Sequence, residues 1–256
     1  MKSIRSLLIL SVWFLGISLP EIGKAAQNNL VKSQIPKTFA IFSVSYNRLG
    51  QEVRGGVCGS AFFISPTRAI TAYHVLQPAS FKPQAGFERV RVWLVHEGER
   101  AIELKPEYLS YQADHDLTRI QLPSLQAVDA KYIFPTTTSA PALSAEVETD
   151  GIRANTAGPV LKKIGQDFEV VSVPRLERLR AAGRLLRRTP VYLSAADVKL
   201  NGAIEFELSY QPVVGLSGGP VVSGGYVIAM NSFADPGGAP RTWALDLRAA
   251  VRARTP

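Results

Sequence analysis

Short runs of apolar residues, many alternating with polar ones, recur from residue 38 onward and are separated by turns rich in Gly, Pro and Asn. Runs of this length and alternation are typical of β-strands that bury one face. Strands are predicted before Pro123 at residues 39–46, 57–64, 69–72, 90–96, 101–104 and 117–122. A second series is predicted at residues 145–153, 159–163, 168–173, 191–195, 203–208, 219–222, 226–233 and 242–245. The pattern therefore predicts an all-β fold, built as barrels or as a sandwich.

Three segments depart from this pattern. Residues 123–144 contain three prolines and a Thr/Ser-rich centre, and they are predicted to link the two series of strands. The segment Arg175–Arg188 carries six arginines, with leucines at helical spacing, which predicts an amphipathic helix in a surface loop. Such a helix would also suit weak contact with an anionic membrane surface, and that interpretation stays open. A short helix over residues 245–252 is predicted to close the fold.

Residues 1–26 have the features of an export signal. Two basic residues precede the apolar run from Leu7 to Leu19, and small residues after it suit cleavage following Ala25 or Ala26. The alternative is an uncleaved membrane anchor, although the run is shorter than the ~20 apolar residues of a full span. We expect export to the periplasm or to the medium.

Composition describes an ordinary globular chain, with 46% hydrophobic and 20% charged residues. The net charge of +8 falls to +6 on cleavage, because the leader contains three basic residues and one acidic residue. Basic charge alone would suggest a nucleic acid partner, but export argues against one. The single cysteine excludes an internal disulfide, so the core must supply the stability.

Candidate chemistry lies in three short blocks, which contain His74, Asp116 and Ser217. A serine between glycines on a tight turn can expose its hydroxyl and its amide together, and a histidine can take the hydroxyl proton. The α/β-hydrolase order requires a histidine after the serine, whereas all three histidines precede Ser217. The subtilisin order requires an aspartate before the histidine, and the first aspartate is Asp114. The order His, Asp, Ser remains, as in chymotrypsin.

Two aspartates compete for the middle position. Asp116 is preferred because an apolar strand follows it directly, and such a position suits a buried carboxylate. Asp114 lies two residues earlier and would share the same face of a strand. His96 and His115 are interpreted as structural or surface residues.

The blocks Thr71–Val75, Asp116–Leu117 and Gly215–Pro220 resemble the signatures of trypsin/chymotrypsin-like serine proteases. The flanking strands 59–65 and 227–232 most resemble the bacterial HtrA-like branch. About 36 residues follow the serine block, and we expect this length to be too short for a PDZ domain. The resemblance implies two antiparallel six-stranded barrels with a cleft between them. Residues 37–124 would carry the histidine and the aspartate, and residues 125–256 the serine.

The resemblance also implies roles for individual residues. Ser217 would be the nucleophile, His74 the general base and Asp116 its orienting carboxylate, while the amides of Gly215 and Ser217 would form the oxyanion hole. The implied substrate is a polypeptide, and no cofactor or metal is expected. Substrate-binding positions would be Gln211 at the pocket base, with Ser232, Phe233, Ala234, Thr242 and Trp243 on its walls.

Activation would differ from that of trypsin-like zymogens. In those zymogens, an aspartate precedes the serine, and this aspartate pairs with the N-terminus that cleavage frees. This chain has Leu216 at that position. We therefore expect the oxyanion loop to be ordered from the start or by ligand. The sequence favours an exported serine endopeptidase. The alternative is a catalytically silent protein of the same fold that acts as a binding protein or a membrane-surface adaptor.

Overall fold

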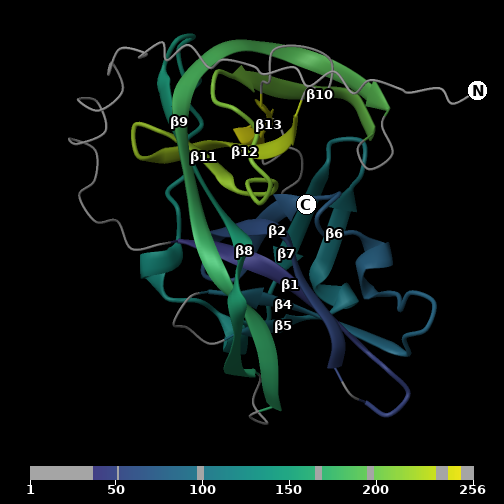
Figure 1. The fold of residues 1–256 in the computed structure, drawn as a ribbon. Coiled ribbons are helices and arrows are strands. Elements are labelled where there is room, and N and C mark those ends of the chain that lie inside the picture. The colour runs from purple at the N-terminus through teal and green to yellow at the C-terminus, as the bar shows by residue number, and fades with distance from the viewer. Residues whose placement is uncertain are drawn as a thin grey trace, which may run out of the picture. The chain divides into compact units, whose positions relative to one another are not determined.

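The structure is a computed structural model. It describes residues 37–50, 52–96, 101–164, 169–194, 199–234 and 242–248, with the main chain alone at 52–54 and 155–175. The predicted export signal lies outside these residues. Within them, no helix is long and apolar enough to span a bilayer. Strands dominate this part of the chain, as Figure 1 shows, and the predicted all-β class is confirmed.

The first sheet is antiparallel and has seven strands in the order β5-β4-β1-β2-β3-β7-β6. Its strands are β1 (Thr38–Tyr46), β2 (Glu52–Ser65), β3 (Arg68–Ala72), β4 (Arg89–Val95), β5 (Ile102–Leu104), β6 (Leu109–Gln112) and β7 (Leu117–Gln121). The sequence predicted six, and β6 is the addition. It is only four residues long and lies at the sheet edge beside β7, so its hydrophobic signal is weak.

The second sheet closes into a barrel in the order β10-β13-β12-β11-β8-β9. Its strands are β8 (Glu146–Ile164), β9 (Glu169–Ser194), β10 (Lys199–Leu208), β11 (Pro220–Ser223), β12 (Tyr226–Ala234) and β13 (Thr242–Asp246). Short 3-10 turns lie at η1 (Pro78–Phe81), η2 (Pro106–Tyr108), η3 (Ser124–Gln126) and η4 (Ala130–Tyr132). Both sheets belong to one compact unit, Pro36–Pro256.

The largest apolar cluster joins the two sheets. It contains Phe39, Phe62 and Ile70 of the first sheet together with Val227 and Met230 of the barrel, all of them buried. Each such side chain contributes about 1.5–3 kcal/mol when fully buried. The joint between the sheets is therefore a continuous core, which fixes side chains from both sheets at their common boundary.

Arg175–Arg188 forms part of strand β9 and not the predicted helix. Leu179, Ala181 and Leu185 are buried or half-buried, while Arg180 and Arg184 between them are exposed. This alternation matches the two-residue period of a strand. Leucines at 176, 179, 185 and 186 fit helical spacing equally well, and pairing with β8 and β10 decides between the two.

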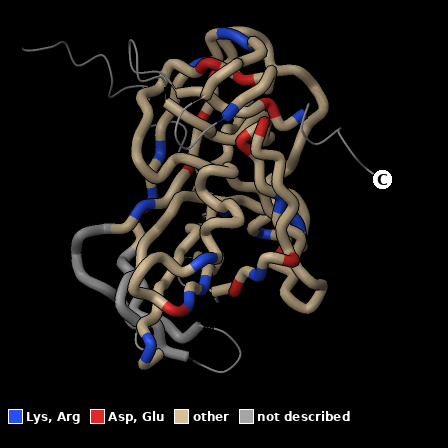
Figure 2. Tube along the Cα trace, turned by 90° about the vertical axis from the view of Figure 1, so that its right-hand side faces the viewer, with Lys and Arg blue, Asp and Glu red and all other residues tan. Residues whose placement is uncertain are grey.

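Acidic side chains on other strands of the barrel pair with several of these arginines. Arg178 donates from Nε to Asp150 Oδ1 at 2.7 Å, and Arg188 donates from Nε to Asp246 Oδ2 at 2.8 Å. Arg187 pairs with Glu207. Figure 2 shows that basic and acidic positions are interspersed along the chain. Contact of Arg175–Arg188 with an anionic membrane stays a prediction.

The second half of the predicted C-terminal helix over residues 245–252, from 249 onward, lies outside the described residues. Its first two positions, Leu245 and Asp246, belong to β13. Helical backbone begins at Leu247. The link predicted over residues 123–144 runs between β7 and β8 and contains η3 and η4.

Adjacent leucines in β9 test its assignment as a strand. Leu185 is 1% exposed in the barrel core, whereas Leu186 is 40% exposed. We expect Leu185→Ala to lower the free energy of unfolding by about 2–5 kcal/mol. Leu186→Ala should change it by less than about 0.5 kcal/mol. Urea denaturation measures both, and equal losses would contradict the strand.

Candidate active site

Pairing between β3 and β7 brings His74 and Asp116 together. The two strands are antiparallel with Ala72 opposite Leu117, so the chain leaves β3 toward His74 at the same end where Asp116 enters β7. The main-chain N–H of Tyr73 donates to the Asp116 carbonyl at 3.0 Å. Residues 42 positions apart in sequence are thereby held side by side by the backbone of the first sheet.

The Asp116 carboxylate is buried and accepts several hydrogen bonds. His74 donates to it from the main-chain N at 3.0 Å and from Nδ1 at 3.0 and 2.9 Å to the two oxygens. Ser232 Oγ, on β12 of the barrel, donates to Oδ2 at 2.6 Å. Because a carboxylate only accepts, Nδ1 carries a proton, and in the neutral imidazole Nε2 is then the acceptor.

Backbone conformation also marks Asp116. Its φ is 48°, in the left-handed region that aspartate visits more readily than most residues. The hydrogen bonds to its carboxylate and to its carbonyl hold this conformation in place. An unusual backbone angle stabilised in this way is common at functional sites.

The competing residues are located elsewhere. Asp114 is 61% exposed and faces His115 Nδ1 at 3.0 Å instead of His74. His96 is buried between the rings of Phe39 and Tyr132 at centroid distances of 5.0 and 4.8 Å. Of the two aspartates, the structure therefore places Asp116 against His74.

Ser217 lies on a turn that packs against β2 and β3. Its carbonyl accepts from the Ser60 N–H at 2.8 Å. A Cβ on Gly59 would lie 2.7 Å from Val75 and 2.9 Å from the Ser217 carbonyl oxygen, so the serine turn lies beside the residue that follows His74. A Cβ on Gly218 would overlap the Ser60 carbonyl, which explains the glycine after the serine.

The turn before Ser217 presents main-chain amides. Leu216 N donates to the Val213 carbonyl at 3.1 Å, and Gly215 occupies the third turn position with φ 105°. A positive φ at that position favours glycine. Within the described residues, the N–H groups of Gly215 and Ser217 donate to no main-chain carbonyl. They are the two amides that the sequence assigned to an oxyanion hole.

In the described part of the chain, no hydrogen bond joins the Ser217 hydroxyl to His74. Contacts between a nucleophile and its base are often long before substrate binds and shorten in the complex. The arrangement supplies a partly exposed hydroxyl, an imidazole with a free acceptor nitrogen and a buried carboxylate behind it. Such a set can abstract a proton from the serine.

Most of the predicted substrate-binding residues lie on β12 and β13. Phe233 stands opposite Trp243 in the sheet, with their rings stacked at a centroid distance of 5.9 Å. Ala234 is exposed and Thr242 is buried. Ser232 is buried with its hydroxyl on Asp116, so its side chain supports the position of that carboxylate.

Gln211, which the sequence places at the pocket base, is exposed, and its role there stays a prediction. Its neighbour Tyr210 is the buried residue, with its hydroxyl on Asn231 Oδ1 at 2.5 Å and its carbonyl accepting from Thr242 Oγ1 at 3.1 Å. The alternation of Phe206, Leu208 and Tyr210 as inward residues of one run was the sequence signal for this position.

A second buried carboxyl lies close to the site. Glu205 on β10 is 0% exposed, and neither of its oxygens has a hydrogen-bond partner in the described part of the protein. Burial, together with the charges of Asp116 and Asp246, raises the pKa of the Glu205 carboxyl well above its usual range. Sequence inspection missed this residue, since nothing in its local pattern distinguishes it from a paired surface glutamate.

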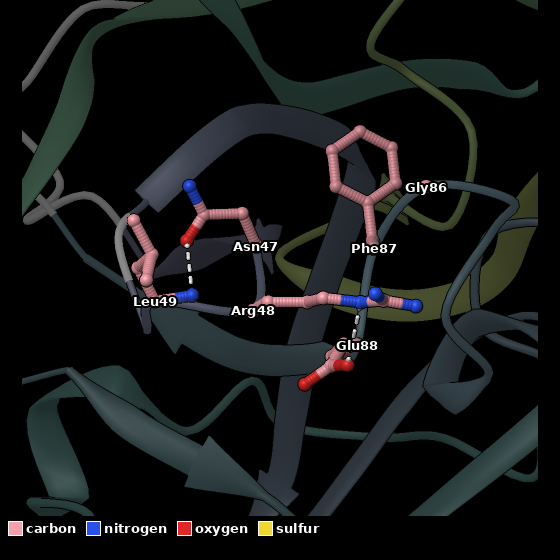
Figure 3. Close-up of a pocket in the computed structure, with 6 residues that line it drawn as sticks. All are labelled: Asn47, Arg48, Leu49, Gly86, Phe87 and Glu88. Atoms are coloured by element: carbon pink, nitrogen blue, oxygen red, sulfur yellow. Dashed lines mark hydrogen bonds and ion pairs between the residues drawn. The ribbon is translucent and has the colours of Figure 1, made fainter.

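An open hollow of about 330 Å³ lies away from these residues. It is formed by the turn after β1 and the segment before β4, where Arg48 pairs with Glu88 (Figure 3). It shares no residue with the candidate active site. Among the described residues, no three His, Cys, Asp or Glu side chains form a group that could hold a metal ion.

Solved structures provide the comparison for this arrangement. The active form of the Rv3671c protease from M. tuberculosis is 19% identical, over 96% of this chain and 92% of that one, with a TM-score of 0.55. The apo MamO protease domain from Magnetospirillum magneticum is 15% identical, over 88% and 100%, with a TM-score of 0.55. Deg5 is 16% identical, over 86% and 88%, with a TM-score of 0.50.

These likenesses show the fold. The chain has the trypsin-like serine protease fold. The fold implied by the sequence resemblance is thereby confirmed, although the first of the two sheets has seven strands instead of six. No protein-family model matches the chain, and no curated protein matches its sequence.

Glu205 makes the stability of the trypsin-like fold depend on pH. Its raised pKa means that the folded chain keeps a proton that the unfolded chain loses above the ordinary glutamate pKa of about 4.3. Stability is therefore lost as pH rises from that value toward the folded pKa. We expect Glu205→Gln to gain stability over wild type by up to about 1.4 kcal/mol per pH unit in this window. Urea titrations between about pH 4 and pH 7 measure the difference.

Glu103→Gln is the matched control with the opposite sign. Arg91 donates to both oxygens of Glu103, at 2.7 and 2.8 Å, and lowers the pKa of that carboxyl. The Arg91–Glu103 ion pair stabilises the folded chain at pH values above the pKa of Glu103 in the unfolded chain, and this stabilisation is lost as pH falls. Glu103→Gln should therefore be less stable than wild type near neutral pH. A Glu205→Gln variant without a gain that grows with pH would contradict the assignment of Glu205.

Proposed function

We propose that this chain is an exported serine endopeptidase that uses His74, Asp116 and Ser217. The observation that carries the proposal is the buried Asp116 carboxylate, which binds Nδ1 of His74 directly beside the turn that displays Ser217. The trypsin-like fold supports it, since this fold provides the two sheets from which such groups can meet. The substrate is a polypeptide, and the chemistry requires no cofactor.

The proposed reaction follows from the positions of the protons. Ser217 Oγ attacks a peptide carbonyl carbon while its proton passes to Nε2 of His74. Asp116 holds the imidazole through Nδ1 and stabilises the imidazolium that forms. His74 then returns the proton to the leaving amine, the C–N bond breaks, and an acyl-serine remains. Water, activated by the same imidazole, hydrolyses this ester and regenerates Ser217.

The negative oxygen that develops in each step needs donors. The amides of Gly215 and Ser217 are suited to this role, because no main-chain carbonyl in the described residues occupies them. Losing one such donor typically costs about 3–4 kcal/mol of transition-state stabilisation. Trypsin-like proteases with deep specificity pockets usually have glycine near the positions of Ala234 and Thr242. The side chains present here narrow the proposed pocket, which favours a small or medium apolar residue on the acyl side of the cleaved bond.

A fluorophosphonate probe tests this proposal, because it forms a covalent bond only with an activated serine. We expect the purified mature protein to be labelled at Ser217 and Ser217→Ala to remain unlabelled. The same substitution should lower peptide turnover by about 10⁶-fold. Ser124→Ala, at an exposed serine in η3, is the control and should react as wild type does. Turnover unchanged in Ser217→Ala would remove this residue from the mechanism.

The second candidate function is a catalytically silent binding protein of the same fold. The observation in its favour is that, within the described residues, Ser217 does not bond to His74. The same probe separates the two functions. A folded wild-type protein that stays unlabelled and does not cleave peptides, yet binds them, would favour the silent protein.

A further inference from the structure

A chain of buried hydrogen bonds lies behind the serine turn. The Tyr210 hydroxyl donates to Asn231 Oδ1 at 2.5 Å, and Asn231 Nδ2 donates to Thr149 Oγ1 at 2.5 Å. Thr149 Oγ1 in turn donates to the Pro220 carbonyl at 2.8 Å. These three side chains are at most 5% exposed. Burial raises the pKa of Tyr210, so its hydroxyl keeps the proton that it donates.

The central residue of this chain also holds the serine turn directly. The Asn231 carbonyl accepts from Gly218 N at 2.9 Å, and Asn231 N donates to the Gly219 carbonyl at 2.9 Å. Asn231 Nδ2 lies 3.3 Å from the same carbonyl and gives it a second donor. Both residues after Ser217 are therefore attached to Asn231, whose carboxamide is itself fixed from two sides.

In the described part of the chain, no charged side chain hydrogen-bonds to this turn. Leu216, before the serine, is 3% exposed and packs in the barrel core. Gly219 N donates to the Leu216 carbonyl at 2.8 Å and closes the turn around Ser217. Within the described residues, the contacts that fix the turn are neutral hydrogen bonds and apolar packing. None of these contacts requires a newly freed chain terminus.

We propose that Asn231 is a positioning residue, which Tyr210 and Thr149 lock in one orientation so that it holds Ser217 and its amide ready for reaction. The inference rests on the proposed protease function and deepens it by naming how the site is regulated. The turn is built into the folded chain, so the protein acts without an activating cleavage. Asn231 touches no reacting atom and works through the backbone of Gly218 and Gly219.

Tyr210→Phe tests the lock, because it keeps the ring and removes only the hydroxyl that fixes the Asn231 carboxamide. Tyr132→Phe is the matched control, since Tyr132 is equally buried at 5% exposure but lies in the core of the first sheet. Both variants are assayed at a temperature well below the midpoints of their thermal unfolding. We expect Tyr210→Phe to lower kcat and the rate of fluorophosphonate labelling by about tenfold with little change in KM, the size of one lost hydrogen bond. Tyr132→Phe should keep the wild-type rates.

Hydrogen–deuterium exchange provides a readout that does not depend on catalysis. We expect the amides of Gly218 and Gly219 to exchange faster in Tyr210→Phe and at the wild-type rate in Tyr132→Phe. Unchanged exchange and labelling in a folded Tyr210→Phe protein would overturn the inference. If wild type never reacts with the probe, the protease proposal fails and with it the catalytic role of Asn231, while exchange still decides whether the lock holds the turn.

Discussion

The candidate site depends on the buried charge of Asp116. A carboxylate at 1% exposure is stable only when donors replace the water that it has lost. Three donors do so, two from His74 and one from Ser232. Because His74 belongs to the first sheet and Ser232 to the barrel, the contacts that solvate the charge also join the two sheets. The hydrogen bonds that orient the imidazole therefore also contribute to the joint between the two sheets.

A contrast between two carboxyls at this joint follows from the same constraint. Hydrogen-bond donors contact both oxygens of Asp116, whereas in the described residues no donor contacts Glu205. The charge of Asp116 also helps to raise the pKa of Glu205. A low-dielectric joint can hold one well-solvated charge at modest cost, but a second charge without donors is strongly disfavoured. Of these two buried carboxyls, only the one with hydrogen-bond donors is placed to carry a charge.

Local sequence predicted the parts of the site whose chemistry is encoded in short blocks. His74, Asp116 and the serine turn were found because their residue types and order leave few alternatives. Strand β9 was assigned incorrectly because its leucines fit two periods, and the acids that pair with its arginines, such as Asp150 and Asp246, are distant in sequence. Glu205 and Asn231 were missed for a related reason, since their roles come from partners that only the folded chain brings near.

Proton NMR at low temperature tests the central claim most directly. If the Asp116 carboxylate holds the imidazole through Nδ1, the folded protein should show a far-downfield N–H resonance from His74. This resonance should disappear in His74→Gln and in Asp116→Ala, and it should persist in Ser217→Ala. Its absence from folded wild-type protein, or its survival in Asp116→Ala, would contradict the account.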